Sequence, residues 1–112
     1  MKNNLLSFLS LAKKAGKIKS GESIILEEIS SMKVNLLIIA SNASDNTKKR
    51  YTDKCHYRNI PTIELSCKDE LGKAIGKGFA AAVAICDEGF AKSFLEKYGR
   101  CEYAKDESLR IS

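Results

Sequence analysis

The sequence predicts an α/β protein, a three-layer α/β/α sandwich around a small sheet. Short apolar runs without polar alternation recur along the chain, which is typical of strands buried on both faces. Segments with helical spacing of apolar residues stand between these runs. Such alternation predicts helices on both faces of a largely parallel sheet. With 44% hydrophobic content, residues 1–112 are expected to form one domain.

The first quarter of the chain is predicted to contain two helices separated by a short strand. Apolar residues with the spacing of one helical face predict a helix over residues 5–12, and Gly16 ends it. Residues 17–19 alternate as Lys-Ile-Lys, which predicts a short edge strand. The Ser-Gly pair that follows suits a helix entrance, so the second helix is predicted over residues 22–31.

A fully apolar run and a polar, capped segment come next. The β-branched and leucine residues of 35–40 predict a central parallel strand that is covered on both faces. Residues 45–56 have helical composition, and Ser44 is a favourable N-cap for that helix.

The second half of the chain repeats this alternation. Residues 61–65 predict a second main strand, with a proline that is tolerated at its first position. Residues 69–76 predict a short helix ended by glycine, residues 80–86 a third buried strand, and residues 87–98 a closing helix. Residues 99–112 have no usable periodicity and are expected to form an irregular tail.

Basic charge is concentrated in the first half of the chain. The formal net charge is +5, and residues 1–60 carry eleven Lys or Arg against five Asp or Glu. This asymmetry favours a polyanionic partner, although the lysines could instead only keep helix faces soluble. No segment approaches the ~20 apolar residues of a membrane span, and the N-terminal segment has no small-residue cleavage site. A cytoplasmic protein without a membrane partner is therefore expected.

The cysteines are predicted to be reduced thiols that are buried or half-buried. Cys55, Cys67, Cys86 and Cys101 contain no Cys-x-x-Cys pair, and His56 is the only histidine. Free cysteine packs readily as a small hydrophobe. No metal and no cofactor are expected, and a metal or redox site is the less favoured alternative.

The residue types that catalysis needs do not assemble in the sequence. The buried strand over residues 35–40 is followed by Ser41 and Asn42, so the acidic phosphoacceptor of a receiver domain is missing. The glycines between Gly72 and Gly78 end a helix instead of following a strand, so they form no phosphate-binding fingerprint. No pair of titratable residues converges, and no enzymatic activity is expected.

Three connections are predicted to meet at one end of the sheet and to bind RNA. In such folds ligands bind beyond the strand ends, and these connections offer phosphate contacts, polar hydrogen bonds and an apolar stacking group. The predicted RNA-binding residues are Lys19, Gly21, Glu22 and Ser23, then Ser41, Asn42, Ala43 and Ser44, then Lys77, Gly78 and Phe79. For Phe79, packing into the core is an equal alternative.

Several short sequence blocks, taken together in their order and spacing, resemble those of a known protein family. The blocks are residues 11–17, 20–22, 36–44, 46–49, 53–55, 59–61, 70–77 and 87–91. Together they span about residues 4–98 and resemble the kink-turn-binding superfamily of L7Ae-like ribosomal proteins, most closely its small bacterial YlxQ-type branch. The resemblance implies a four-stranded mixed sheet and the binding of structured RNA without catalysis.

The resemblance also implies an RNA face built on a Gly-x-Asn-Glu-x-x-Lys motif. The matching residues here are 21–27, where Ser23 and Ile24 stand in place of Asn and Glu, and Glu27 in place of Lys. Shifting the match by one residue makes Glu22 and Ser23 the residues that read base edges. The site is therefore carried over without a specificity for the standard kink.

The predicted function is binding of structured RNA in association with the ribosome or translation, with ribosomal RNA as one candidate. The flanking lysines expected to contact phosphate are Lys13, Lys14, Lys17 and Lys48. The alternative is a protein-interaction module on the same fold whose RNA site has decayed, as Ile24 in place of a polar residue suggests. No DNA partner is specifically implied, and the oligomeric state stays open.

Overall fold

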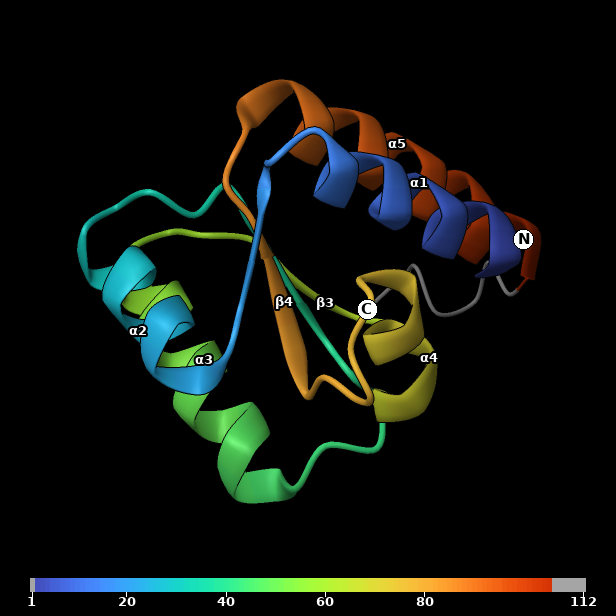
Figure 1. Ribbon diagram of the computed structural model, residues 1–112. Coiled ribbons are helices and arrows are strands. Elements are labelled where there is room, and N and C mark those ends of the chain that lie inside the picture. Colours follow the sequence, from blue (N-terminus) through green and yellow to red (C-terminus); the bar gives the residue numbers. More distant parts are fainter. Residues whose placement is uncertain (1, 106–112) are drawn as a thin grey trace.

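Five helices and four strands make up the part of the chain that the structure describes (Figure 1). The computed structural model describes residues 2–105, with side chains over residues 4–99. In chain order the elements are α1 (Lys2–Lys14), β1 (Ile18–Ser20), α2 (Glu22–Ser30), β2 (Leu36–Ile39), α3 (Asp45–Tyr57), β3 (Thr62–Glu64), α4 (Lys68–Ala74), β4 (Ala82–Ile85) and α5 (Glu88–Lys105). Each element predicted from the sequence is present.

The four strands form one mixed sheet in the order β1-β4-β2-β3. Only β2 and β3 are parallel, whereas β4 is antiparallel to both of its neighbours, β1 and β2. The expectation of a largely parallel sheet is therefore wrong. The four-stranded mixed sheet implied by the family resemblance is confirmed.

The direction of β4 follows from the way the chain returns after α4. This helix is short, and the chain turns back at Gly76, whose φ of 77° favours glycine. The N–H of Ala80 then donates to the C=O of Lys68 at the start of the same helix (3.0 Å). The chain thus comes back to the end of the sheet that it left, and β4 must run against β2.

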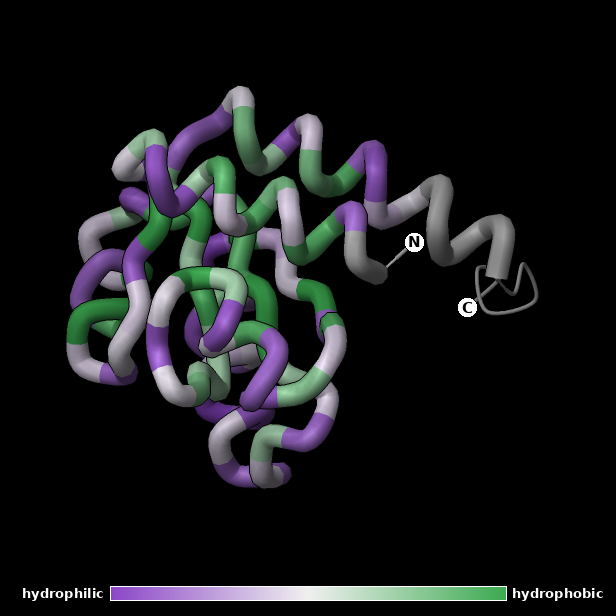
Figure 2. Tube along the Cα trace, turned by 45° about the vertical axis from the view of Figure 1, so that its right-hand side comes forward, coloured by the Kyte–Doolittle hydropathy of each residue, from purple (hydrophilic) through white to green (hydrophobic). Residues whose placement is uncertain are grey.

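Helices cover both faces of the sheet, so the predicted three-layer sandwich is confirmed. α1, α4 and α5 lie on one face, and α2 and α3 lie on the other (Figure 1). Strongly apolar segments run through the interior of the molecule (Figure 2), and every residue of β2 and β4 is buried. Phe94 of α5 is fully buried and packs against Phe8 of α1, with 6.2 Å between the ring centroids.

Helix starts agree with the sequence better than helix ends do. The hydroxyl of Ser44 accepts a hydrogen bond from the N–H of Thr47 (3.1 Å), which confirms the predicted N-cap of α3. α5 ends at Lys105, so the irregular tail expected from residue 99 is wrong over residues 99–105. Residues 106–112 lie outside the described residues. None of the described helices is long and apolar enough to cross a membrane.

Three of the four cysteines can be placed, and each is a free thiol as predicted. Cys55 is buried, and Cys67 and Cys86 are half-buried. Burial raises the pKa of the Cys55 thiol from 9.0 to about 11, and it also raises the pKa of Cys86. The side chain of Cys101 is outside the described residues. Within residues 4–99, no group of His, Cys, Asp and Glu could hold a metal ion.

We expect Cys55 to resist alkylation in the folded protein. Its side chain is fully buried and its pKa near 11 keeps the thiolate scarce near neutral pH. Iodoacetamide treatment and peptide mass spectrometry should detect modified Cys55 only after denaturation, with Cys67 as an internal control for the reagent. Rapid modification of Cys55 in the native protein would contradict this packing.

The same pKa shift predicts a loss of stability at alkaline pH. The folded pKa is higher than the unfolded one, so this contribution is fully present below pH 9.0 and is lost as pH rises toward about 11. Urea unfolding of the wild type and of Cys55→Ala over this range measures the effect. The difference in stability between the two proteins should shrink as pH rises, and a constant difference would contradict the shift.

Candidate nucleic-acid interface

The strand register brings the three predicted connections to one end of the sheet, which confirms their predicted convergence. Ser20 at the end of β1 pairs with Val83, and Ile39 at the end of β2 pairs with both Ala82 and Glu64. The exits of β1, β2 and β3 and the entrance to β4 therefore lie at one end of the sheet, the lower end in Figure 1. We call it the loop end, which comprises residues 19–24, 40–44, 64–68 and 76–81.

Backbone hydrogen bonds hold the connections of the loop end together. The N–H of Ala40 donates to the C=O of Ala81 (2.8 Å), which joins the exit of β2 to the entrance of β4. The N–H of Ser41 donates to the C=O of Ser66 (2.8 Å), which joins the exits of β2 and β3. The surface is thus built on fixed backbone, and its side chains start from defined positions.

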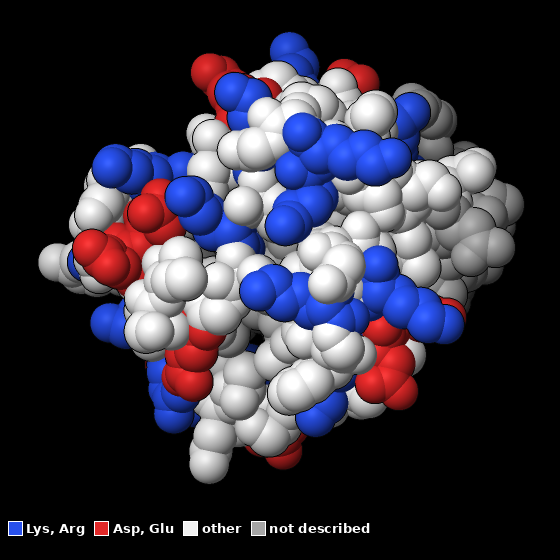
Figure 3. Space-filling model, viewed as in Figure 1, with Lys and Arg blue, Asp and Glu red and all other residues white. Residues whose placement is uncertain are grey.

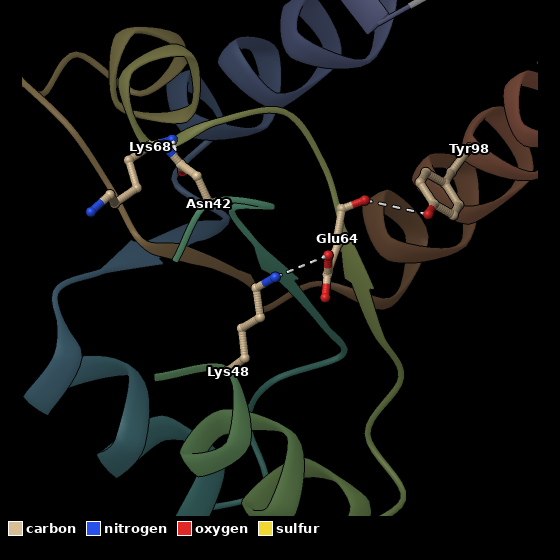
Figure 4. A network of polar contacts seen from close by, with 5 residues as sticks. All are labelled: Asn42, Lys48, Glu64, Lys68 and Tyr98. Carbon is tan, nitrogen blue, oxygen red and sulfur yellow. Dashed lines mark hydrogen bonds and ion pairs between the residues drawn. The ribbon is translucent and has the colours of Figure 1, made fainter. Parts of the chain in front are cut away.

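Of residues 41–44, which connect β2 to α3, some present groups at the surface and others stabilise the fold. Ser41 is exposed, and the Oδ1 of Asn42 accepts a hydrogen bond from the N–H of Lys68 (2.9 Å; Figure 4). Ser44 caps α3, so its hydroxyl is already engaged. Ala43 is buried, which makes the expectation of an RNA contact by its side chain wrong. Ser41 and Asn42 are the residues of this segment that present polar groups.

The N-terminus of α2 offers backbone N–H groups. Gly21 has φ 94° and ψ 130°, a conformation that favours glycine, and no side chain caps the helix. The N–H of Ile25 donates to the C=O of Gly21 (2.9 Å) as the first bond of the helix. Helix geometry leaves the N–H groups of Glu22, Ser23 and Ile24 available to an anion.

The turn before β4, which contains Phe79, packs closely on α4. Gly72 of α4 is buried, and a Cβ added there would lie 2.3 Å from the Cα of Phe79. The N–H of Lys77 donates to the C=O of Gly72 (2.7 Å). Only glycine at position 72 lets the turn pack this closely on α4. The Phe79 side chain is 64% exposed, so the alternative of core packing is wrong.

Two ion pairs order charged side chains at the loop end. Arg50 of α3 pairs with Glu22 in the first turn of α2. Lys48 pairs with Glu64 (3.4 Å), whose C=O also accepts a hydrogen bond from the hydroxyl of Tyr98 (3.3 Å; Figure 4). Lys48 thus lies at the loop end, where a phosphate contact was expected, but its ammonium group is paired with the Glu64 carboxylate.

Three of the predicted phosphate contacts lie at the other end of the sheet. Lys13 and Lys14 end α1, and Lys17 precedes β1. The C=O of Lys17 accepts a hydrogen bond from the N–H of Cys86 (2.8 Å), and its Nζ lies 3.7 Å from Asp87. Both partners follow β4, at the end remote from the loop end. The structure does not bring these three lysines together with the other predicted residues.

Basic side chains predominate over α1 and β1 (Figure 3), while acidic ones lie mainly toward α2 and beside α4. At the loop end, Lys19 and Lys77 are exposed. Neither lysine pairs with a carboxylate among the residues whose side chains are described. Their positive charge is therefore available to an anionic partner.

Three residues of this site were not predicted: Arg50, Lys68 and Gly72. The contributions of Arg50 and Lys68 depend on contacts across the fold that no local pattern encodes. Gly72 was open to prediction, because a glycine inside a helical pattern often marks a close backbone approach.

This arrangement defines a small α/β/α sandwich whose loop connections gather at one end and suit an anionic partner. The chain belongs to the ribosomal protein L7Ae/L30e/S12e/Gadd45 family, whose sequence model matches residues 3–95. The resemblance inferred from the sequence is thereby confirmed.

Several known proteins align with most of the chain. An RNA-binding protein YlxQ of Bacillus subtilis is 38% identical over 78% of this chain and 87% of its own length. A YlxQ of Enterococcus faecium is 36% identical over 81% of this chain and 87% of its own. A large ribosomal subunit protein eL8 of Picrophilus torridus is more distant, at 28% identity over 76% of this chain and 68% of its own.

Solved structures share the fold. A protein of unknown function from Bacillus halodurans superposes with a TM-score of 0.79 at 33% identity, over 82% of this chain and 93% of that one. A 15.5 kD RNA-binding protein of Giardia lamblia superposes with a TM-score of 0.71 at 22% identity, over 83% of this chain and 82% of that one. The second likeness supports the fold alone.

We expect Gly72→Ala to destabilise the protein by about 1–3 kcal/mol, because the new methyl group overlaps the backbone of Phe79. Gly78→Ala is the matched control, since a Cβ at that position meets nothing within 4 Å. Urea unfolding measures both variants. Equal stabilities of the two variants would contradict the close packing of the turn on α4.

Proposed function

We propose that this chain binds structured RNA through the loop end, without catalysis, in association with the translation machinery in the cytoplasm. One observation carries the proposal: four groups that suit RNA lie together at the loop end. They are the N-terminus of α2, the exposed Lys19 and Lys77, and the exposed Phe79. Membership of the family and relatives named as RNA-binding proteins support it.

Each part of the loop end matches a different feature of folded RNA. The N–H groups at the start of α2 and the ammonium groups of Lys19 and Lys77 suit phosphates. Ser41 and Asn42 suit base edges and 2′-hydroxyls, which unpaired nucleotides expose. Phe79 suits a base that has left its stack, because every base offers an apolar face to an aromatic ring.

The first turn of α2 sets the preference for the RNA. Glu22, ordered by its ion pair with Arg50, accepts hydrogen bonds from exocyclic amino groups, and Ser23 beside it donates or accepts. Glu27 is exposed farther along the helix and repels phosphate. We therefore propose a kinked RNA whose backbone avoids Glu27, bound with base preferences that differ from those of the standard kink.

We expect Lys19→Glu combined with Lys77→Glu to lower affinity for a kink-turn RNA at least about tenfold near 0.1 M salt. With about four phosphates neutralised, the wild-type slope of log affinity against log salt is about −3 to −4, and the variant should lose about two units of it. Fluorescence anisotropy titrations at several salt concentrations measure both quantities.

The matched control for this charge reversal is Lys54→Glu with Arg58→Glu at the C-terminal end of α3, which changes the net charge equally and breaks none of the ion pairs of the described side chains. It should leave affinity nearly unchanged. Wild-type binding that ignores salt, or equal losses in the two double variants, would refute a phosphate contact at the loop end.

We expect Phe79→Ala to weaken RNA binding without destabilising the fold. The ring is 64% exposed, so its removal opens no cavity, whereas loss of base stacking costs about 1–3 kcal/mol of binding free energy. Phe79→Tyr is the conservative control and should bind almost as the wild type does. Titrations and thermal unfolding of the three proteins separate the two effects, and unchanged affinity of Phe79→Ala would exclude stacking by this ring.

A protein-interaction module is the alternative function, because Ile24 is 50% exposed in the first turn of α2. An apolar side chain there suits a protein partner better than a base edge. Pulldown from cell extract with and without nuclease separates the two functions. Partners retained after nuclease treatment favour the alternative, and partners released by it favour RNA binding.

A further inference from the structure

Four lysines lie on or beside the open edge of the sheet, and all of them except Lys19 lie away from the loop end. Lys13 and Lys14 end the helix that leads into β1, Lys17 precedes that strand, and Lys19 lies within it. β1 pairs only with β4 among the described strands. We call these four lysines the edge row. Figure 3 shows basic side chains over α1 and β1, and further basic side chains toward the loop end.

The edge row keeps an excess of positive charge over the acidic groups that face it. Asp87 pairs with Lys17 at 3.7 Å, between side chains that are 30% and 44% exposed. Burial and the Glu28 carboxylate of α2 raise the pKa of the Cys86 thiol, and Lys19 lowers it, so both charged groups lie near this thiol. Lys13 and Lys14 are exposed and have no ion pair within the described part of the chain. The row therefore attracts an anion that is longer than one phosphate.

The length of the row fits a double helix better than a compact anion. β1 is extended over Ile18–Ser20, so the Cα atoms of Lys17 and Lys19 are about 7 Å apart along the edge at ~3.3 Å per residue, and Lys13 and Lys14 add charge beyond Lys17. Double-stranded nucleic acid in the B-form carries a charge for every ~1.7 Å of its axis, so several phosphates fall along such a span. An edge strand also presents backbone N–H groups that no neighbouring strand uses.

We propose that the edge row binds the phosphates of a double-helical RNA stem that continues from the nucleotides held at the loop end. This inference rests on the proposed function and deepens it, because it assigns a second surface of the protein, away from the loop end, to the stem of the bound RNA. The loop end reads the unpaired nucleotides, and the edge row holds the A-form stem by its backbone, independently of sequence. Lys19 stands at the junction of the two surfaces.

Two RNAs with the same kink-turn and stems of different length test the proposal. One has a stem of about five base pairs, too short to pass the loop end, and the other has a stem of about fifteen. Lys13→Ala with Lys14→Ala removes two charges from the row and leaves the ion pair of Lys17 intact. Lys54→Ala with Arg58→Ala removes two charges from the C-terminal end of α3, breaks none of the ion pairs of the described side chains, and is the matched control.

We expect the wild type to bind the long-stem RNA more tightly than the short-stem RNA. The edge-row variant should bind the long-stem RNA about three- to tenfold more weakly, with a salt slope smaller by about two, and should bind the short-stem RNA as the wild type does. The control variant should match the wild type on both RNAs. Thermal unfolding checks that both variants keep the fold.

The outcomes separate this inference from the proposed function. If the wild type binds both RNAs equally, or if the edge-row variant weakens both equally or neither, the inference is overturned and the loop-end function stands. If the wild type binds neither RNA, the proposed function fails and this inference fails with it.

Discussion

The close packing of the Phe79 backbone on Gly72 is the constraint on which the loop end depends. A residue with a Cβ at position 72 would push the turn away from α4. Because the turn lies there, the chain re-enters the sheet where β3 leaves it, and β4 runs antiparallel between β1 and β2. This close backbone contact thus fixes the turn that leads into β4, and with it the position of the exposed aromatic ring.

The same topology divides the basic charge of the first half of the chain into two surfaces. β1 crosses the sheet over Ile18–Ser20, so lysines that are close in sequence lie toward opposite ends of the sheet. Small anions need only the N-terminus of α2. The structured RNA proposed as the ligand would be long enough to contact both surfaces, so the proposal does not require every lysine to serve one contact.

The sequence predicted the elements, the sandwich and the convergence of the three connections, because apolar runs, helical spacing and the Ser44 cap are local signals. It failed where the cause was not local. Alternation alone gave a parallel sheet, since it does not reveal that the chain folds back at Gly76. It grouped Lys13, Lys14 and Lys17 with the loop end, and it could not show that Arg50 pairs with Glu22. Phe79 was undecided because a residue at a strand entrance has no fixed side.

Photo-crosslinking of a bound kink-turn RNA, followed by mapping of the modified peptides, tests the central claim most directly. The account predicts crosslinks in residues 19–24, 41–44 and 77–79, with the strongest at Phe79, whose exposed ring is the one aromatic group of these segments. Crosslinks confined to the outer surfaces of α3 or α5, with none in these three segments, would contradict it.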